Sequence, residues 1–345
     1  MSIATRSSPS SASLSSTFDV PVSLELRIFE GKFKSSHGPS LFYFSLYPPS
    51  EHTLRGVVLF LHGAGDHCRR YIALYERLCE RGFGVITYDL VNHGASDCDC
   101  HKTRGHVRSF QNLVDDTNAY VTFAKKIIFP QTSHSSPPLI ISGMSFGSLV
   151  GLHVVLSGQH KFFAAFWAAP TVGVEMTTIW KVQAAFIQPL ALLLPRLRLV
   201  PGVDYELLWR DPGYLEDFKT DTLATMDDIT TRTMQQTRCA MDRLIKDKTI
   251  QQAGSGFCAL SMLFLVGSED HVADNGVSRR FYHKIANTDK AFKVFEGVFH
   301  CVFDDPERET IFDFLCQWLQ ERFPEQPTDQ TPVVHIYKKN SDKFA

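Results

Sequence analysis

One pentapeptide of the sequence places a serine where it could act as a nucleophile. Residues 143–147 read Gly-Met-Ser-Phe-Gly, with Ser145 at the centre. The apolar run Leu139–Gly143 predicts a strand before it, and Phe146–Leu156 predicts a helix after it. A sharp strand-to-helix turn exposes the serine of a nucleophile elbow, and small flanking residues let the two elements approach closely. Ser145 is therefore the candidate nucleophile; the alternative is a glycine-rich turn with a passive serine.

A serine is a weak nucleophile unless a base takes its proton. Asp270 follows the predicted strand Leu260–Gly267, and His300 lies just beyond the predicted strand Ala291–Glu296. In the nucleophile-elbow architecture the acid and the histidine follow the serine in this order. We therefore expect His300 to take the proton of Ser145 and Asp270 to orient the imidazole. Three further carboxylates are weaker candidates for the acid: Glu269, Asp274 and Glu175.

A second glycine-rich turn could stabilise the charge that forms on the substrate. His-Gly-Ala-Gly at residues 62–65 follows the apolar run Val57–Leu61. Such a turn supplies one backbone N–H of an oxyanion hole, and the residue after the nucleophile supplies the other. We assign these donors to Ala64 and Phe146. The alternative is a plain tight turn.

These candidate residues need a scaffold of alternating strands and helices, and the sequence supplies that pattern. Two strands, Leu24–Glu30 and Leu41–Tyr47, are predicted to pair across a turn at His37–Ser40. Continuous apolar strands that alternate with helices indicate a mostly parallel sheet covered by helices on both faces. The further predicted strands are Phe83–Asp89 and Phe162–Ala168. The further predicted helices are Arg70–Arg81, Val272–Ile285 and Pro306–Arg322, and another helix is predicted to begin at Ser109.

The alternation stops between Thr171 and Gly256, where the composition is helical and prolines recur. An insertion of this size between sheet strands predicts a helical cap, residues 171–256, over the strand ends where ligands bind. The α/β core is then residues 21–170 and 257–323. Residues 1–20 and 324–345 are predicted to be tails. The Ser-rich N-terminus lacks the apolar centre of a secretory signal, and an organelle leader remains the alternative to a disordered tail.

Composition excludes two classes of protein. Lys and Arg number 35 against 37 Asp and Glu, so the formal net charge of −2 argues against a nucleic-acid partner. No stretch approaches the roughly 18 uninterrupted apolar residues of a membrane-spanning helix. The eight cysteines show neither metal-ligand nor disulfide-framework spacing, which favours a reducing compartment. Cys98 and Cys100 form the one close pair, whose role stays open. We expect no metal and no organic cofactor.

Several motifs resemble the monoacylglycerol lipase group of α/β-hydrolases, which is often labelled lysophospholipase-like. They are His-Gly-Ala-Gly-Asp-His at 62–67, Asn-His-Gly-Ala-Ser at 92–96 and Arg-Gly-His-Val-Arg-Ser-Phe at 104–110. The resemblance implies the α/β-hydrolase fold with a helical cap inserted between sheet strands. It also implies that Asp66 and Arg70 form the polar end of the substrate pocket. Three positions depart from the usual residues of this group: Met144 stands for His, Asn92 for Gly and Asp66 for Glu.

The resemblance and the candidate triad together imply a serine hydrolase that cleaves lipid esters through an acyl-enzyme, with monoacylglycerol as the expected substrate. The alternatives are a lysophospholipase, a broad carboxylesterase, an acyltransferase with the same triad, or a catalytically silent binding protein. The apolar segment Val182–Pro195 precedes Arg196 and Arg198, and an apolar helical face beside cations can dock on a bilayer. The alternative is a cap helix packed on the core. We expect a cytoplasmic protein, with peripheral membrane contact through the cap; the oligomeric state is not predicted.

Overall fold

The computed structural model describes residues 26–132, 136–174, 187–200 and 204–325. Both predicted tails fall largely outside these residues. Glu175 and residues 182–186, at the start of the apolar cap segment, fall outside them as well.

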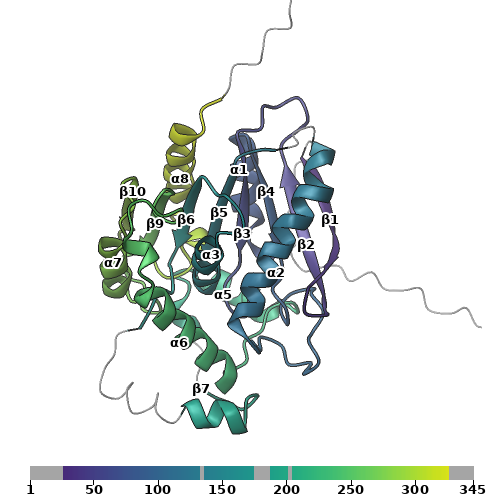
Figure 1. Ribbon diagram of the computed structural model, residues 1–345, viewed down its shortest axis with the longest axis vertical. Coiled ribbons are helices and arrows are strands. Elements are labelled where there is room, and N and C mark those ends of the chain that lie inside the picture. Colours follow the sequence, from purple (N-terminus) through teal and green to yellow (C-terminus); the bar gives the residue numbers. More distant parts are fainter. Residues whose placement is uncertain (1–25, 133–135, 175–186, 201–203, 326–345) are drawn as a thin grey trace, which may run out of the picture.

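One sheet dominates the described residues, with eight strands in the order β1-β2-β4-β3-β5-β6-β9-β10 (Figure 1). β1 pairs antiparallel with β2, and β2 pairs antiparallel with β4, whereas the other neighbours run parallel. Every residue of β3, β4, β5 and β6 is buried, as expected for parallel strands covered on both faces. The strand bounds are β1 (Arg27–Lys34), β2 (Ser40–Tyr47), β3 (Gly56–Leu61), β4 (Phe83–Tyr88), β5 (Leu139–Met144), β6 (Ala164–Ala168), β9 (Ser261–Gly267) and β10 (Lys290–Phe295).

Helices cover both faces of this sheet and divide the hydrophobic core into two layers. Side chains of α2, α3 and α7 pack in one layer, and those of α1 and α8 pack in the other. The helix bounds are α1 (Ile72–Glu80), α2 (Phe110–Phe123), α3 (Phe146–Ser157), α5 (Pro212–Thr220), α6 (Thr231–Lys246), α7 (Asn275–Lys284) and α8 (Arg308–Arg322). The predicted α/β-hydrolase fold, a mostly parallel sheet covered by helices on both faces, is confirmed by this topology.

Two predicted bounds differ from the observed ones by three or more residues, and each has a local cause. The first strand, Arg27–Lys34, extends four residues past the predicted end at Glu30, because β1 is an edge strand whose alternating exposure gives no apolar run to mark it. Leu24 and Glu25, at the predicted start, lie outside the described residues. The helix predicted from Val272 begins only at Asn275. The carboxylate of Asp270 accepts the N–H groups of Val272 and Ala273, both at 2.9 Å, so these residues form a turn before the helix.

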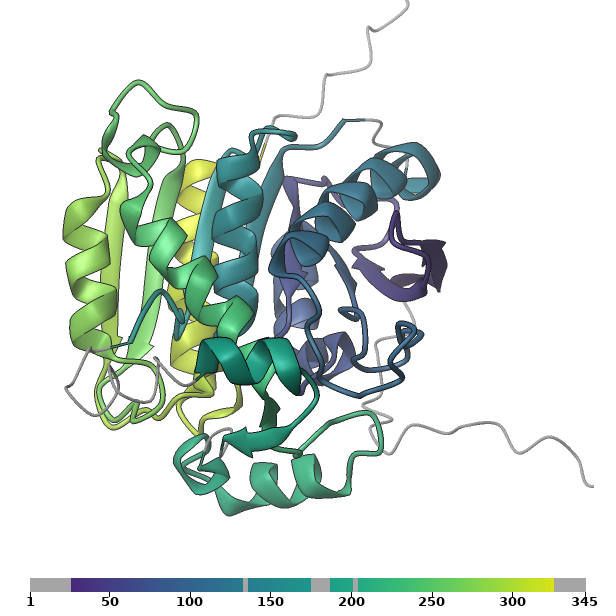
Figure 2. The same cartoon turned by 60° about the horizontal axis from the view of Figure 1, so that its bottom comes forward.

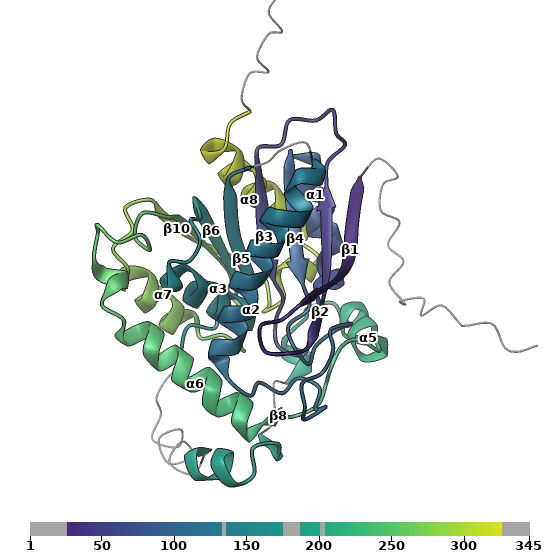
Figure 3. The ribbon, with the colours of Figure 1, turned by 45° about the vertical axis from the view of Figure 1, so that its right-hand side comes forward.

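The inserted segment, by which we mean the described part of residues 171–256, lies at the end of the sheet where the parallel strands finish. Its helices α5 and α6 and two short strands lie around that edge (Figures 2 and 3). The short strands, β7 (Arg198–Val200) and β8 (Ile229–Thr230), pair antiparallel and were not predicted. The N–H of Thr225 donates to the carbonyl of Gly65 at 2.7 Å, which joins this segment directly to the loop after β3.

Candidate active site

Ser145 stands in a strained turn between β5 and α3. Its φ of 51° lies in the left-handed region that non-glycine residues rarely adopt. A Cβ atom on Gly143 would come within 2.4 Å of the backbone of Gly147, and one on Gly147 would come within 2.2 Å of the carbonyl oxygen of Leu61. The two glycines therefore allow strand and helix to meet closely enough to present the serine, as the elbow motif predicts.

Asp270 and His300 lie together beside the same sheet edge. The imidazole Nδ1 of His300 is 2.9 Å and 3.0 Å from the two carboxylate oxygens of Asp270, and both side chains are almost fully buried. A buried carboxylate at Nδ1 fixes the orientation of the ring and stabilises its charged form. His300 and Ser145 line one cavity. The structure thus brings all three predicted residues to one place.

The weaker candidates for the acid are used elsewhere or are not described. The side chain of Glu269 is exposed and lies 3.7 Å from His271. The carboxylate of Asp274 accepts the N–H of Val277 at 2.9 Å and caps α7. Glu175 lies outside the described residues. Of the described candidates, Asp270 is the one that contacts His300.

Thr171, which no sequence motif singled out, places its hydroxyl oxygen 3.1 Å from that of Ser145. Among the described residues, no hydrogen bond joins the Ser145 hydroxyl to His300, so the nucleophile rests against Thr171. The sequence did hold a sign of this contact, because Thr171 comes three residues after the predicted strand at 162–168 and so belongs to the same carboxyl edge of the sheet as the elbow.

The two predicted oxyanion donors come from different elements next to the serine. Phe146 is the first residue of α3, where a helix terminus carries free N–H groups and partial positive charge. Ala64 is exposed in the oxyanion loop, by which we mean residues 63–67. Neither N–H has an acceptor among the described residues, so both can bind an oxyanion. Burial lowers the pKa of His62, and its neutral ring accepts the N–H of Leu90 at 3.0 Å, which anchors the start of this loop.

The cavity between the core and the inserted segment holds about 110 Å³. This volume is well below the roughly 300–1,000 Å³ of pockets that enclose a drug-sized ligand. The core contributes Gly63, Ala64, Asp66, Tyr71, Met144, Ser145, Val272, His300 and Cys301, and the inserted segment contributes Arg198, Tyr205, Leu208, Trp209, Phe218, Thr225, Asp227, Asp228, Ile229 and Thr233.

The match to a family model extends over residues 52–307, and that model is described as serine aminopeptidase, S33. The chain belongs to this family of α/β-hydrolases. The family resemblance stated from the motifs is therefore confirmed. The description of the family names a peptidase, so family membership by itself does not identify the substrate.

Relatives within the family include named lipases. Human monoglyceride lipase is 25% identical over 284 residues, which cover 81% of this chain and 87% of the relative. Phospholipase YtpA of Bacillus subtilis is 24% identical over 260 residues, which cover 74% of this chain and 92% of the relative. A soluble variant of monoglyceride lipase from Saccharomyces cerevisiae, solved with a substrate analog, has a TM-score of 0.74 at 20% identity and covers 90% of this chain and 99% of that one. Family and relatives together support an ester hydrolase.

Two departures from the usual residues of the monoacylglycerol lipase group have well-defined surroundings, and one of them, Met144, also lines the cavity. Asn92 adopts a φ of 64°, a conformation that asparagine tolerates better than most residues. Its side chain donates to the carbonyl of His106 at 2.6 Å and accepts the N–H of Asp99 at 2.8 Å, which secures the turn. Met144 is buried and packs in the core layer of α1 and α8.

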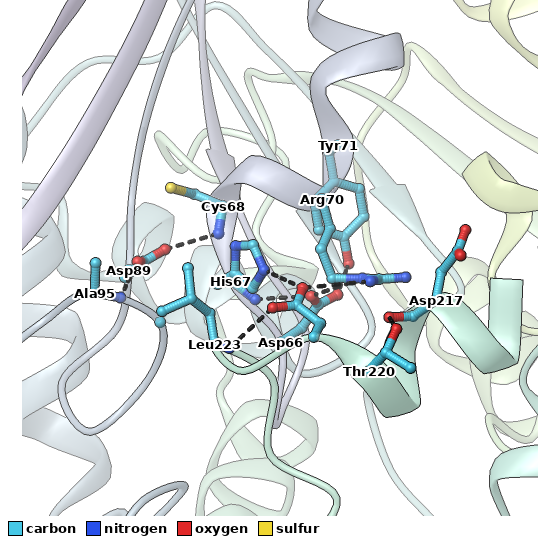
Figure 4. A network of polar contacts seen from close by, with 12 residues as sticks. Asp66, His67, Cys68, Arg70, Tyr71, Asp89, Ala95, Asp217, Thr220 and Leu223 are labelled. Carbon is cyan, nitrogen blue, oxygen red and sulfur yellow. Dashed lines mark hydrogen bonds and ion pairs between the residues drawn. The ribbon is translucent and has the colours of Figure 1, made fainter. Parts of the chain in front are cut away.

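Asp66 and Arg70, the two residues predicted to bind substrate, lie close together (Figure 4), but they relate differently to the cavity. Asp66 lines the cavity and accepts the hydroxyl of Tyr71 at 2.7 Å. Arg70 is not among the residues that line the cavity. Its buried guanidinium lies 3.4 Å from Asp66, 3.5 Å from Asp221 and over the ring of Phe218. The structure therefore places Asp66 at the cavity wall and Arg70 behind Asp66, outside the lining.

Two half-buried groups follow His300 in the chain, and one of them, Cys301, lines the cavity. Burial raises the pKa of Asp304 to about 6 although Arg70 is near, and its carboxylate lies 3.4 Å from the indole nitrogen of Trp209. Burial also raises the pKa of the Cys301 thiol well above its usual value, so this cysteine stays protonated beside His300.

The other sequence signals stay apart from this site. Cys100 is exposed, and its sulfur lies 4.0 Å from the guanidinium of Arg108. In the described part of the chain, no three His, Cys, Asp or Glu side chains gather closely enough to hold a metal ion. A search of the same residues finds no helix with the length and apolar character needed to span a bilayer.

Proposed function

We propose that this protein is a serine hydrolase of lipid carboxylic esters and that its substrate is a monoacylglycerol, released as fatty acid and glycerol. The observation that carries the proposal is the buried Asp270–His300 pair, which opens onto the same cavity as the strained Ser145. Two unused N–H groups border that serine. A catalytically silent binding protein would not need this combination.

The reaction that we propose proceeds through an acyl-enzyme. Ser145 turns from Thr171 toward His300, which takes its proton as the serine oxygen attacks the ester carbonyl. The oxyanion accepts hydrogen bonds from the N–H groups of Ala64 and Phe146, each worth roughly 3–4 kcal/mol in the transition state. His300 then protonates the departing alcohol, and water, activated by the same histidine, releases the fatty acid.

The charges around the cavity favour a neutral substrate over an anionic one. Asp66, Asp227 and Asp228 line it, and the one arginine among the lining residues, Arg198, already lies 3.1 Å from Asp227. A lipid phosphate would be repelled by these carboxylates, whereas glycerol hydroxyls could donate to them. This supports monoacylglycerol over a lysophospholipid, and it agrees with the names of the monoglyceride lipases among the relatives.

The inserted segment offers a surface for membrane contact, and we propose that it docks on lipid. In the helical stretch 187–193 and the residue after it, Ile187 and Ala191 are buried whereas three successive leucines project outward. These are Leu192, Leu193 and Leu194, exposed by 77%, 75% and 53%. Arg196 is exposed beside them. An apolar ridge next to a cation suits the surface of a bilayer. In this proposal residues 171–256 act as the cap, and the protein is cytoplasmic with peripheral membrane contact.

A panel of esters tests the substrate assignment. Purified protein is offered monoacylglycerol, lysophosphatidylcholine, lysophosphatidic acid and p-nitrophenyl esters, all at matched acyl chain length. The proposal predicts the highest kcat/KM on monoacylglycerol. Equal rates on all of them would indicate a broad esterase, and a preference for the phosphate-bearing lipids would indicate a lysophospholipase. Added alcohol that captures the acyl group faster than water would indicate an acyltransferase.

A further inference from the structure

The inserted segment touches the oxyanion loop directly, through backbone as well as side chains. The Thr225 N–H donates to the Gly65 carbonyl at 2.7 Å. Gly65 has a φ of 74°, and a Cβ atom there would lie 2.5 Å from the Thr225 carbonyl oxygen. The two segments are therefore in contact at the residue that follows the proposed donor Ala64.

Asp221 makes the side-chain part of this contact, and its partners His67 and Arg70 are labelled in Figure 4. One of its carboxylate oxygens lies 2.6 Å from Nε2 of His67 and 3.5 Å from the guanidinium of Arg70. The other oxygen accepts the N–H of Leu223 at 2.9 Å, which fixes the carboxylate on its own turn. The side chains of Asp221 and His67 are 4% and 3% exposed, so solvent screens this contact little.

The ionisation of Asp221 agrees with a strong contact. Burial would raise the pKa of its carboxyl group, but the hydrogen bond and charge of His67 and the charge of Arg70 outweigh burial and leave this pKa below its usual value. The group is therefore an anion at neutral pH, and charge-assisted hydrogen bonds of this kind are stronger than neutral ones.

The core holds the same loop from its other end. The carboxylate of Asp89 accepts the N–H of Cys68 at 2.7 Å, directly after His67, and the N–H of Ala95 at 2.7 Å (Figure 4). The loop is thus fixed by the core at its end and by the inserted segment at Gly65 and His67. Little freedom remains for the peptide that carries the N–H of Ala64.

We propose that Asp221 is a positioning residue for the oxyanion hole. Through His67 and Arg70 it holds the oxyanion loop so that the N–H of Ala64 points at the charge that develops on the ester oxygen. The inference rests on the proposed ester hydrolysis and adds a role for the cap: it contributes to the chemical step as well as to substrate access. Because the effect acts on the transition state, it extends to short soluble esters that need no cap to reach Ser145.

The test compares Asp221→Asn with Asp217→Asn, the same substitution at an exposed position of α5. Turnover of p-nitrophenyl butyrate gives kcat and KM. Inhibition by a trifluoromethyl ketone, relative to the matching methyl ketone, reports the oxyanion hole because the fluorinated ketone readily forms the tetrahedral adduct. We expect Asp221→Asn to lower kcat about 10- to 100-fold with KM almost unchanged, as for a displaced catalytic group. The preference for the trifluoromethyl ketone should fall in parallel, and Asp217→Asn should match the parent.

Unchanged kcat and an unchanged ketone preference in folded Asp221→Asn would overturn the inference, as would a rise in KM alone. If the parent itself does not hydrolyse the ester, the proposed function fails and this inference fails with it. If circular dichroism shows that Asp221→Asn does not fold, the variants His67→Gln and His67→Leu test the same contact through its other residue. Gln retains an N–H donor for Asp221 and should keep most of the ketone preference, whereas Leu should lose it. Full preference in both His67 variants would also overturn the inference.

Discussion

The hydroxyl oxygens of Ser145 and Thr171 lie 3.1 Å apart, and the Thr171 N–H is 3.4 Å from the Ser145 carbonyl oxygen. This hydrogen bond holds the nucleophile in a conformation in which, among the described residues, its hydroxyl does not bond to His300. Hydrogen bonds of this type contribute about 0.5–1.5 kcal/mol net. In the reaction that we propose, attack on an ester requires the Ser145 side chain to leave Thr171, and this step adds to the barrier of acylation.

Replacement of Thr171 by Val removes that hydroxyl and keeps the shape of the side chain. We expect Thr171→Val to speed fluorophosphonate labelling of Ser145 about two- to tenfold, the factor that corresponds to one net hydrogen bond. Thr310→Val, at an exposed position of α8, serves as the control. A tenfold slower reaction would mean instead that the Thr171 hydroxyl assists the reacting groups.

The proposed triad predicts an ordered series of losses. Ser145→Ala should abolish ester turnover and probe labelling, and His300→Ala should lower turnover nearly as much, because the triad acts as a unit. Asp270→Asn should reduce kcat by about 10⁴, since the imidazole loses the partner that sets its tautomer. Glu269→Gln is the matched control and should remain active. A severe loss of turnover in Glu269→Gln together with a mild loss in Asp270→Asn would show that Glu269, and not Asp270, is the acid of the triad.

Local patterns in the sequence were sufficient to place Ser145, Asp270 and His300 at one sheet edge. The elbow needs its glycines and its strand-to-helix context within five residues, and the other two residues follow consecutive parallel strands. The contact between His67 and Asp221 could not be predicted in this way, because the two residues are 154 positions apart and Asp221 lies in a segment without sheet periodicity. The resemblance implies that Arg70 lies at the pocket. In the structure its guanidinium packs over the ring of Phe218 and does not line the cavity.

Asp66 is the polar residue best placed to recognise glycerol. It lines the cavity, and Tyr71 and the N–H of His67 already donate to it at 2.7 Å each. Loss of a partner for a substrate hydroxyl destabilises the complex by about 1–3 kcal/mol. We expect Asp66→Asn to lower kcat/KM roughly tenfold or more on monoacylglycerol and clearly less on a p-nitrophenyl ester of equal chain length. Equal losses on both esters would show that Asp66 supports the loop without contacting the glycerol group.

The exposed leucines predict a selective defect on membranes. Leu192→Asp places a charge on a side chain that makes few contacts within the described residues, so the fold should persist. Removing one such leucine from lipid costs about 1.5–3 kcal/mol. We expect vesicle binding to weaken tenfold or more in sedimentation assays, and turnover of long-chain ester to slow, while short soluble esters react normally. Ile127→Asp, at an exposed position beyond the end of α2, controls for the added charge. Unchanged vesicle binding in Leu192→Asp would rule out this docking surface.

A buried carboxyl group remote from the site predicts how stability depends on pH. Asp116 is 2% exposed on α2 and accepts a hydrogen bond from Ser35, and burial raises its pKa from 3.8 to about 6. Between these two values the native state holds a proton that the unfolded chain has lost. The contribution of this group to stability therefore falls as the pH rises from about 4 to about 6 and stays unfavourable above that range.

Asp116→Asn removes this charge and keeps an acceptor for the Ser35 hydroxyl. We expect it to raise the free energy of unfolding by about 1–3 kcal/mol at pH 8, the value that follows from the pKa difference, and to change it little at pH 4. Urea denaturation at both pH values measures the effect. Asp242→Asn, at an exposed position of α6, should have almost no effect at either pH. A gain at pH 4 as large as that at pH 8 would attribute the stabilisation to packing, and no gain at pH 8 would show that the buried carboxylate is not destabilising.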